Sequence, residues 1–150
     1  NHILGNYVGT DITGRAARPN GSAGIQITDG ASYNTIGGAT PGTNNLISGN
    51  GSFGLVIFGQ GNVVQGNYIG TDATGTGRLG NGGNGLVLGF GSRENVIGGV
   101  VSGARNLISA NGGSGIQLSP GASENAIMGN YVGTGVVGKL ALGTEAAASN

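Results

Sequence analysis

The chain has 150 residues, with six acidic and six basic side chains and no cysteine. This length suits one domain with a core of its own, and the missing cysteines exclude disulfides and thiolate metal sites. Glycine is abundant at 36 residues, but the three prolines and the lack of a Gly-X-Y period exclude collagen. There is no basic patch for nucleic acid, and no apolar run approaches the ~20 residues of a membrane span.

From the N-terminus onward, short motifs recur at a long interval. Asn-Tyr-Val-Gly-Thr at 6–10 returns, with Val or Ile in third place, at 67–71 and 130–134. A second motif, Asn-Leu-Ile-Ser, occupies 45–48 and 106–109, which are 61 residues apart. The long unit therefore consists of two half-units of about 30 residues, a period typical of solenoids.

Each half-unit contains three segments that are predicted to be short β-strands. In chain order, the first series occupies 1–3, 34–36, 62–64, 95–97 and 125–127. The second series begins at Asn6, Asn45, Asn67, Asn106 and Asn130. The third series occupies 24–27, 54–57, 85–88 and 115–118. The second series is unevenly spaced because a long loop, 37–44 or 71–84, falls before its strand in one half-unit and after it in the next.

Strands this short cannot bury an apolar face alone, so we expect equivalent strands to stack about 4.8 Å apart in successive coils. Alternation then places one set of Ile, Val and Leu side chains inward in three columns. Asparagine opens the first two series in coil after coil, and stacked amides can form hydrogen-bonded ladders. A propeller or sandwich would need hairpin signals that are absent from this sequence. We therefore predict an all-β parallel β-helix of about five coils of ~30 residues.

The Gly-Ile-x-Ile, Asn-x-Ile-x-Gly and Gly-Asn-Tyr-Ile-Gly-Thr-Asp motifs resemble the right-handed parallel β-helix repeats of the pectate-lyase-like superfold. They are most similar to the long repetitive versions in secreted or surface proteins of environmental bacteria. This resemblance covers nearly the whole chain. It implies an extracellular or cell-surface location and contact with saccharides, but no particular reaction, because the fold hosts many functions. We expect residues 1–150 to form a single domain, an excerpt of a longer repeat array.

The charged residues offer few candidates for chemistry. Glu94 and Glu124 lie one coil apart, so this acidic pair could share a cation or raise the pKa of one carboxyl for acid–base work. Alternatively, the two acids are solvated at a corner, where Arg93 neutralises one of them. Asp11 and Asp72 are expected two coils apart, where each caps its own loop rather than sharing calcium. His2 has no partner for catalysis. We expect no catalytic residue, metal or cofactor, and Asn20 and Asn50 stand in glycosylation-type sequences.

One outward surface stands out in the second series. Alternation makes its outward column a continuous apolar and aromatic stripe of Tyr7, Leu46, Tyr68, Leu107 and Tyr131. Either a long loop covers this stripe, with Leu79 or Leu140 folding back over it, or the stripe contacts a sugar or a protein partner.

The function expected from these features is that of a structural or adhesive extracellular scaffold, which could stack on copies of itself into fibres through open coil ends. The alternative is a polysaccharide-binding module or a polysaccharide-active lyase or hydrolase that uses a groove on the flank. The expected partners are copies of the chain itself or an extracellular saccharide.

Overall fold

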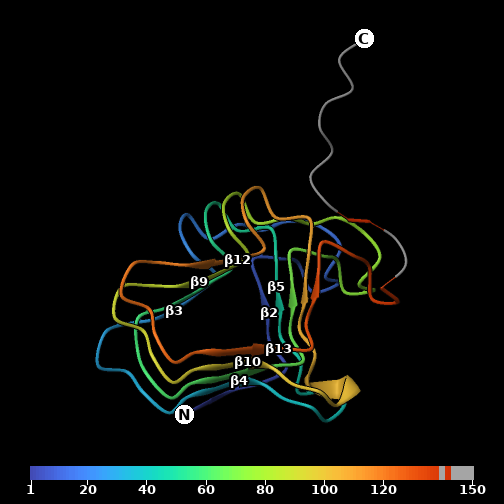
Figure 1. The fold of residues 1–150 in the computed structure, drawn as a ribbon. Coiled ribbons are helices and arrows are strands. Elements are labelled where there is room, and N and C mark those ends of the chain that lie inside the picture. Colours follow the sequence, from blue (N-terminus) through green and yellow to red (C-terminus); the bar gives the residue numbers. More distant parts are fainter. Residues whose placement is uncertain (139–140, 143–150) are drawn as a thin grey trace.

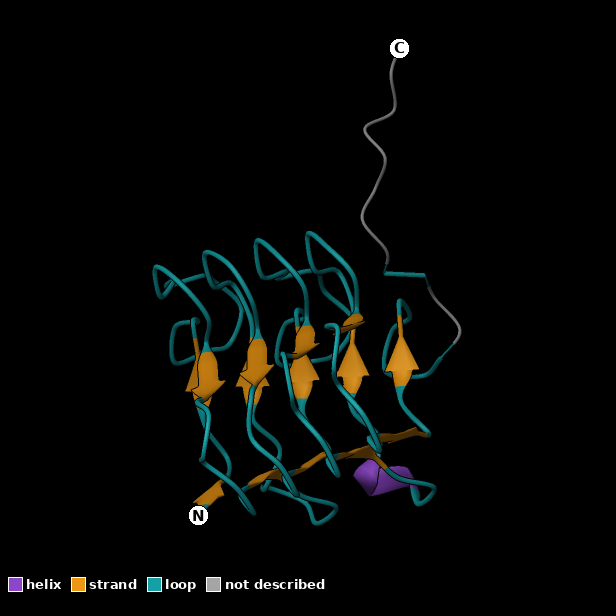
Figure 2. Cartoon of the chain, turned by 60° about the vertical axis from the view of Figure 1, so that its left-hand side comes forward, coloured by secondary structure: helices purple, strands orange, loops and turns teal. Residues whose placement is uncertain are grey.

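A computed structural model of the chain describes residues 1–138, 141 and 142. Its strands form three sheets in which all neighbours pair in parallel, so the chain is a β-solenoid, as predicted. Figure 1 looks along the stack and shows the three sheets around one interior, while Figure 2 shows the coils side by side.

Each sheet takes one strand from every coil. Sheet I contains β1 (His2–Ile3), β4 (Thr35–Gly37), β7 (Val63–Gln65), β10 (Val96–Gly98) and β13 (Ala126–Met128). Sheet II contains β2 (Tyr7–Val8), β5 (Leu46–Ile47), β8 (Tyr68–Ile69), β11 (Leu107–Ile108) and β14 (Tyr131–Val132). Sheet III contains β3 (Ile25–Ile27), β6 (Leu55–Ile57), β9 (Leu86–Leu88) and β12 (Ile116–Leu118).

Among the described residues, the strands make four complete coils and two strands of a fifth, in agreement with the prediction of about five coils. In the described part of the chain, the only helix is the 3-10 turn η1 (Ser102–Ala104), which lies in a loop before β11. The residues that follow Leu142 lie outside the described part.

The interior is lined by the predicted columns of aliphatic side chains. In sheet III, Leu55 pairs in register with Ile25 on one side and Leu86 on the other, and Leu86 pairs with Ile116. The core cluster is formed by Ile27, Ile36, Ile47, Leu55, Ile57, Val64, Ile69, Leu86, Leu88, Ile97 and Ile108. Burying each of these side chains contributes roughly 1.5–3 kcal/mol to the free energy of folding. Because each is buried against aliphatic side chains of the adjacent coils, every coil is stabilised by its neighbours.

Asparagine ladders run along the stack beside this core. In each ladder the Nδ2 of one asparagine donates to the Oδ1 of the asparagine in the next coil, at 2.8–3.0 Å. Asn45 shows the complete pattern: its Oδ1 accepts from the backbone N and the Nδ2 of Asn6, and its Nδ2 donates forward to Asn67 and back to the Ile3 carbonyl. A buried amide with all its partners carries no desolvation penalty, which is why these asparagines can be fully buried.

The sequence predicted two of the three ladders. Those of sheets I and II begin at Asn1 and Asn6. The third, which was missed, consists of Asn20, Asn50, Asn81 and Asn111 at the corner before sheet III. The glycosylation-type reading of Asn50 is wrong, because its side chain is buried and its Nδ2 is bound to Asn81.

Mutation of a central ladder residue tests this account of stability. Asn67 is fully buried, and its Oδ1 accepts from Asn45 while its Nδ2 donates to Asn106 and Ile36. We expect Asn67→Ala to lower the free energy of unfolding by about 3 kcal/mol or more, because several buried groups lose their partners. Urea denaturation measures this. Asn44→Ala, one residue before ladder residue Asn45, is the control and should change stability by less than about 0.5 kcal/mol.

Candidate functional site

The predicted apolar stripe exists as a column on the outer face of sheet II. Tyr7 pairs with Leu46, Leu46 with Tyr68, Tyr68 with Leu107, and Leu107 with Tyr131, each in register. The exposure of these residues alternates. Leu46 and Leu107 are each only 1% exposed, Tyr7 is 48% exposed, and the other two tyrosines are half-buried. The stripe is therefore covered at its leucines and open at its tyrosines.

The cover comes from loops that follow sheet II in alternate coils, residues 11–17, 72–78 and 135–138, which we name the roof loops. A Cβ atom placed on Gly14 would lie 2.7 Å from Leu46 Cδ2, so the loop backbone presses on that leucine. The same test at Gly75 gives 3.0 Å to Leu107 Cδ2. Both glycines have positive φ, of 66° and 70°, which glycine adopts at little cost.

Each roof loop reaches the next roof loop two coils away. The Ala73 N–H donates to the Gly14 carbonyl at 3.0 Å, and the Val136 N–H donates to the Gly75 carbonyl at 3.0 Å. A loop must therefore arch over the intervening coil, and the residue that it covers there is the leucine. The covering contacts identified lie at the loop backbone of Gly14 and Gly75. Leu140, which was expected to fold back over the stripe, lies outside the described residues.

A second row of loops precedes sheet II in the other coils, at residues 38–44 and 99–105, which we name the wall loops. The Gly66 N–H donates to the Ala104 carbonyl at 3.3 Å, and the Gly5 N–H donates to the Thr43 carbonyl at 3.2 Å. The backbone of one wall loop approaches the other so closely at Gly103 that a Cβ there would collide with the Ala39 carbonyl oxygen.

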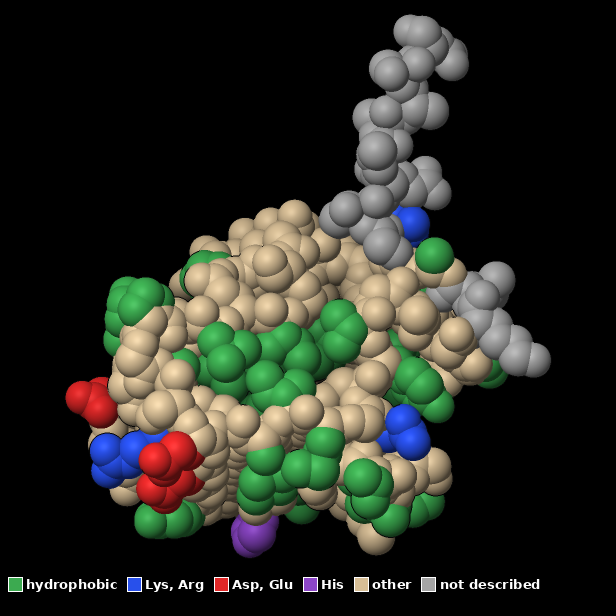
Figure 3. Space-filling model, viewed as in Figure 1, with side chains coloured by type: hydrophobic (Ala, Val, Ile, Leu, Met, Phe, Trp, Pro, Cys, Tyr) green, Lys and Arg blue, Asp and Glu red, His purple; other side chains and the backbone are tan. Residues whose placement is uncertain are grey.

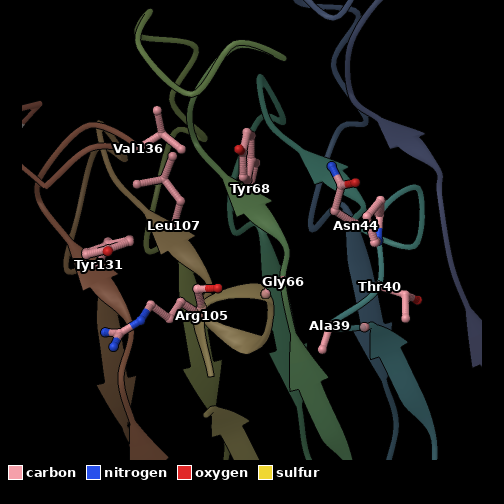
Figure 4. A pocket seen from close by; sticks show the side chains of 13 residues that line it. Ala39, Thr40, Asn44, Gly66, Tyr68, Arg105, Leu107, Tyr131 and Val136 are labelled. Carbon is pink, nitrogen blue, oxygen red and sulfur yellow. The ribbon is translucent and has the colours of Figure 1, made fainter. Parts of the chain in front are cut away.

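A groove of about 360 Å³ lies over sheet II, with side chains from the stripe in its floor. Its lining is mostly apolar and comes from both rows of loops: Gly38, Ala39, Thr40, Pro41, Asn44, Gly66, Tyr68, Ser102, Gly103, Arg105, Leu107, Tyr131 and Val136. Figure 4 shows Tyr68, Leu107 and Tyr131 on successive strands, with Val136 beside Leu107. The groove thus joins three of the five predicted stripe residues.

Arg105 is the one charged residue of this lining. Its Nη1 donates to the Gly129 carbonyl at 2.9 Å, and its guanidinium carbon lies 5.4 Å from the centre of the Tyr131 ring. This carbonyl bond and the cation–π contact hold the guanidinium in one place. Burial raises the pKa of Tyr68 above its ordinary value of 10.0, so its hydroxyl stays protonated and can donate a hydrogen bond at neutral pH.

Arg105 is not among the site residues predicted from the sequence. Its place in the repeat is informative: it directly precedes Asn106, as Asn44 directly precedes Asn45. Both residues enter the groove from the ends of the wall loops. Comparison of these repeat positions could have indicated that a polar side chain is presented here once in every two coils.

The predicted acidic pair lies elsewhere, at the corner before sheet I. Glu94 and Glu124 belong to adjacent coils, since Arg93 bridges Ser123 and Asn95 bonds to Asn125. Both glutamates have positive φ, 57° and 56°, and both side chains are exposed. Arg93 Nε lies 3.9 Å from Glu94 Oε1, the geometry of a weak surface ion pair.

This corner column is a backbone feature. Tyr33 and Gly61 hold the same position in earlier coils and also have positive φ, 58° and 65°. Within the residues that the structure describes, no cluster of three or more His, Asp or Glu side chains could hold a metal ion. The geometry thus brings Glu94 and Glu124 together without the additional groups that a metal site or an acid–base centre needs.

Asp11 and Asp72 cap their roof loops, as expected. Asp72 Oδ1 accepts from the Thr74 hydroxyl at 2.6 Å and from the Gly77 N–H at 3.0 Å. Burial acts to raise the pKa of Asp72, but these hydrogen bonds outweigh it and lower the pKa below 3.8. The Thr13 hydroxyl and the N–H groups of its own loop likewise lower the pKa of Asp11.

The lowered pKa of Asp72 gives a stability effect of known sign. A carboxyl with a lowered folded-state pKa stabilises the fold above its unfolded value of 3.8, and this contribution is lost as the pH falls through the folded value. We expect Asp72→Ala to cost about 1–2 kcal/mol near pH 7, and to cost progressively less below pH 3.8. Urea unfolding at several pH values measures the difference. Asp29→Ala removes a carboxylate with no hydrogen bond to the described residues and is the control; an Asp72 effect that does not change with pH would contradict the capping role.

Comparison with protein-family models, with curated proteins and with solved structures returned no match for this chain. Among the described residues, no helix is long and apolar enough to cross a bilayer. The functional argument therefore depends on the geometry of the groove, the ladders and the loops.

Proposed function

We propose that this chain is a structural or adhesive scaffold. Its function is to form the solenoid and to present the surface of the solenoid to a partner. The observation that carries this proposal is the nature of its polar groups. The buried asparagines satisfy one another in ladders, and the carboxylates of Asp11 and Asp72 are bound within their own loops. Groups already saturated with structural hydrogen bonds support a role in the fold rather than in turnover.

An extracellular or cell-surface setting is part of this proposal. It is supported by the resemblance of the repeats to pectate-lyase-like β-helices and by the low content of charged residues. The polar exterior of such a scaffold consists largely of amides, hydroxyls and backbone, which do not depend on a particular pH or salt concentration.

A polysaccharide-active enzyme is the alternative, and the Glu94 and Glu124 pair is the feature that favours it. We expect no turnover when the chain is incubated with acidic and neutral polysaccharides, because a solvated acidic pair next to Arg93 lacks a positioned acid or base. Reducing-end assays and ultraviolet absorbance for unsaturated products measure this. Turnover that disappears in the Glu94→Gln, Glu124→Gln double variant would replace the scaffold with an enzyme.

The ladders give any further stacking a direction. Every ladder asparagine except the last of its ladder donates forward. The last ones in sheets I and II, Asn125 and Asn130, donate one N–H back to a carbonyl and leave the other for a following coil, while Asn1 and Asn6 present carboxamide oxygens at the other end. The last strand of each sheet also exposes an apolar side chain, namely Leu118, Ile127 and Val132. Figure 3 shows hydrophobic side chains gathered on this end of the stack, between β12 and β13. A following coil continues the ladders only if its asparagine oxygens face the N–H groups of Asn125 and Asn130. Two donor ends, or two acceptor ends, cannot form ladder hydrogen bonds with each other.

The roof loops add a second condition. They follow β2, β8 and β14, so they occur in the first, third and fifth coils, and wall loops occur in the second and fourth. Joining two copies end to end would place a fifth coil directly against a first coil. The roof loops that follow β14 of one copy and β2 of the next would then leave from adjacent strands only about 4.8 Å apart, and both would need the same space over sheet II. A coil with a wall loop could stack on the first or the fifth coil without this clash, because its long loop lies on the other side of sheet II.

Self-stacking into fibres, which the sequence led us to expect, has this steric cost, so we expect the chain to be a monomer in dilute solution. Sedimentation velocity over a range of concentrations measures the mass. Long polymers would show that the roof loops can rearrange, and they would make self-assembly the function of the scaffold. Asn130 Nδ2 donates one N–H back to the Ile97 carbonyl and has one left to face forward. Asn130→Asp replaces this forward donor with an acceptor, so it should abolish any such polymers if they form through the ladders.

A further inference from the structure

We propose that the groove over sheet II binds an acidic, proline-rich peptide segment in the polyproline II conformation. This inference builds on the proposed scaffold function, because it names the partner of the surface that the scaffold presents. Three observations carry it: the spacing of the tyrosines, the single fixed cation in the lining, and the absence of carboxylates from that lining.

The spacing of the two half-buried tyrosines matches one turn of a polyproline II helix. Tyr68 and Tyr131 occupy the same register position on β8 and β14, with Leu107 on β11 between them. Two strand spacings place their backbones about 9.6 Å apart. A polyproline II helix has three residues per turn at 3.1 Å each, so it repeats about every 9.3 Å. Aromatic-lined grooves bind such helices by packing against successive turns.

The charge of the groove specifies an acidic residue in that segment. Arg105 is charged and no Asp or Glu lines the groove, so the lining carries an unbalanced positive charge. Nη1 of Arg105 bonds to Gly129 and Nη2 approaches the Val100 carbonyl at 3.5 Å. Three of the five N–H groups of an arginine then have no acceptor in the described part of the chain. A carboxylate that approaches this guanidinium would form charge-assisted hydrogen bonds without having to order the side chain.

The lining favours a peptide over a sugar. Saccharide hydroxyls lose their hydrogen bonds with water on binding and must be repaid by carboxylates and amides. The groove has hydroxyl groups but no carboxylate and a single side-chain amide, Asn44, while Ala39, Pro41, Leu107 and Val136 give it apolar surface. Proline rings need no such partners, and the solvated carbonyls of a polyproline II chain can accept from the protonated hydroxyl of Tyr68.

A synthetic peptide with the sequence Pro-Pro-Glu repeated four times tests the proposal against the intact chain. It places a carboxylate on the same side of every turn, so isothermal titration calorimetry should detect binding. The same peptide with Gln in place of Glu should bind roughly tenfold more weakly, because it lacks the charge-assisted bond. A Gly-Ser-Glu repeat of equal length and charge should also bind more weakly, since its flexible chain must be ordered on binding.

The matched variant is Arg105→Asn, which installs the residue that the preceding repeat carries at this position, Asn44. It should lose the preference for Glu over Gln and bind the acidic peptide roughly tenfold more weakly, while its circular dichroism spectrum shows that the fold is kept. Arg93→Gln removes a cation at the distant corner and should bind like the wild type. Tyr68→Phe keeps the ring and removes only the hydroxyl, so it gives a second measure of weakened binding if Arg105→Asn is unstable.

Lack of binding by the acidic peptide, or equal binding by the Arg105→Asn and wild-type chains, would overturn the proposal. Saturable binding of a neutral or acidic oligosaccharide that competes for Tyr68 and Arg105, with no peptide binding, would also overturn it and assign the groove to sugars. These failures are distinct from failure of the scaffold function, which turnover in the polysaccharide assay would reveal.

Discussion

The rest of the structure depends on the ladder asparagine, which bonds to the coil before it and to the coil after it. Asn45 accepts twice from Asn6, donates once to Asn67 and returns one hydrogen bond to the Ile3 carbonyl. These four bonds span three coils and fix the spacing between them at a point where the chain turns. The aliphatic columns supply most of the free energy, but aliphatic side chains tolerate sliding and repacking. The amides do not, because a shifted amide leaves buried donors and acceptors without partners. Register in this solenoid is therefore set by the polar ladder and made favourable by the apolar core.

A strict coil repeat leaves the outside of the molecule free to follow another period. The insertions alternate between the two sides of sheet II, so the surface repeats every two coils while the core repeats every coil. This explains why tyrosine and leucine alternate along the stripe. A roof loop leaves from the coil of Tyr7 and presses on Leu46 in the next coil before it meets Ala73. The residue that the roof loop covers, such as Leu46, has no access to water and must be fully apolar. The residue in the coil from which the loop leaves, such as Tyr7, keeps an exposed edge and can carry a hydroxyl.

Much of this could be predicted from the sequence, because equal spacing along the chain becomes vertical stacking in space. The three aliphatic columns, the ladders that begin at Asn1 and Asn6 and the outward stripe all follow from that rule. The third ladder also had a signal, in the even spacing of Asn20, Asn50, Asn81 and Asn111, but an asparagine before glycine is equally typical of a turn. The arching of the roof loops could not be predicted, since it depends on contacts between loops two coils apart. The groove and the role of Arg105 depend on the positions of these loops, so they could not be predicted from the sequence either.

The distribution of charge is the last consequence of the ladders. A neutral amide can be stacked indefinitely, whereas stacked carboxylates or ammonium groups would repel one another at a spacing of about 4.8 Å. A solenoid that repeats its polar residues in every coil must therefore build its interior from amides. Like charges in adjacent coils are tolerated only where water solvates them, as at the exposed corner of Glu94 and Glu124. Arg105 and Asp72 are partly buried, and their repeat equivalents lie two coils away, so the position of each must be explained locally. Asp72 is explained by its loop, while the position of Arg105 on the ring of Tyr131, inside a groove without acids, is the feature that we attribute to the acidic peptide proposed as its ligand.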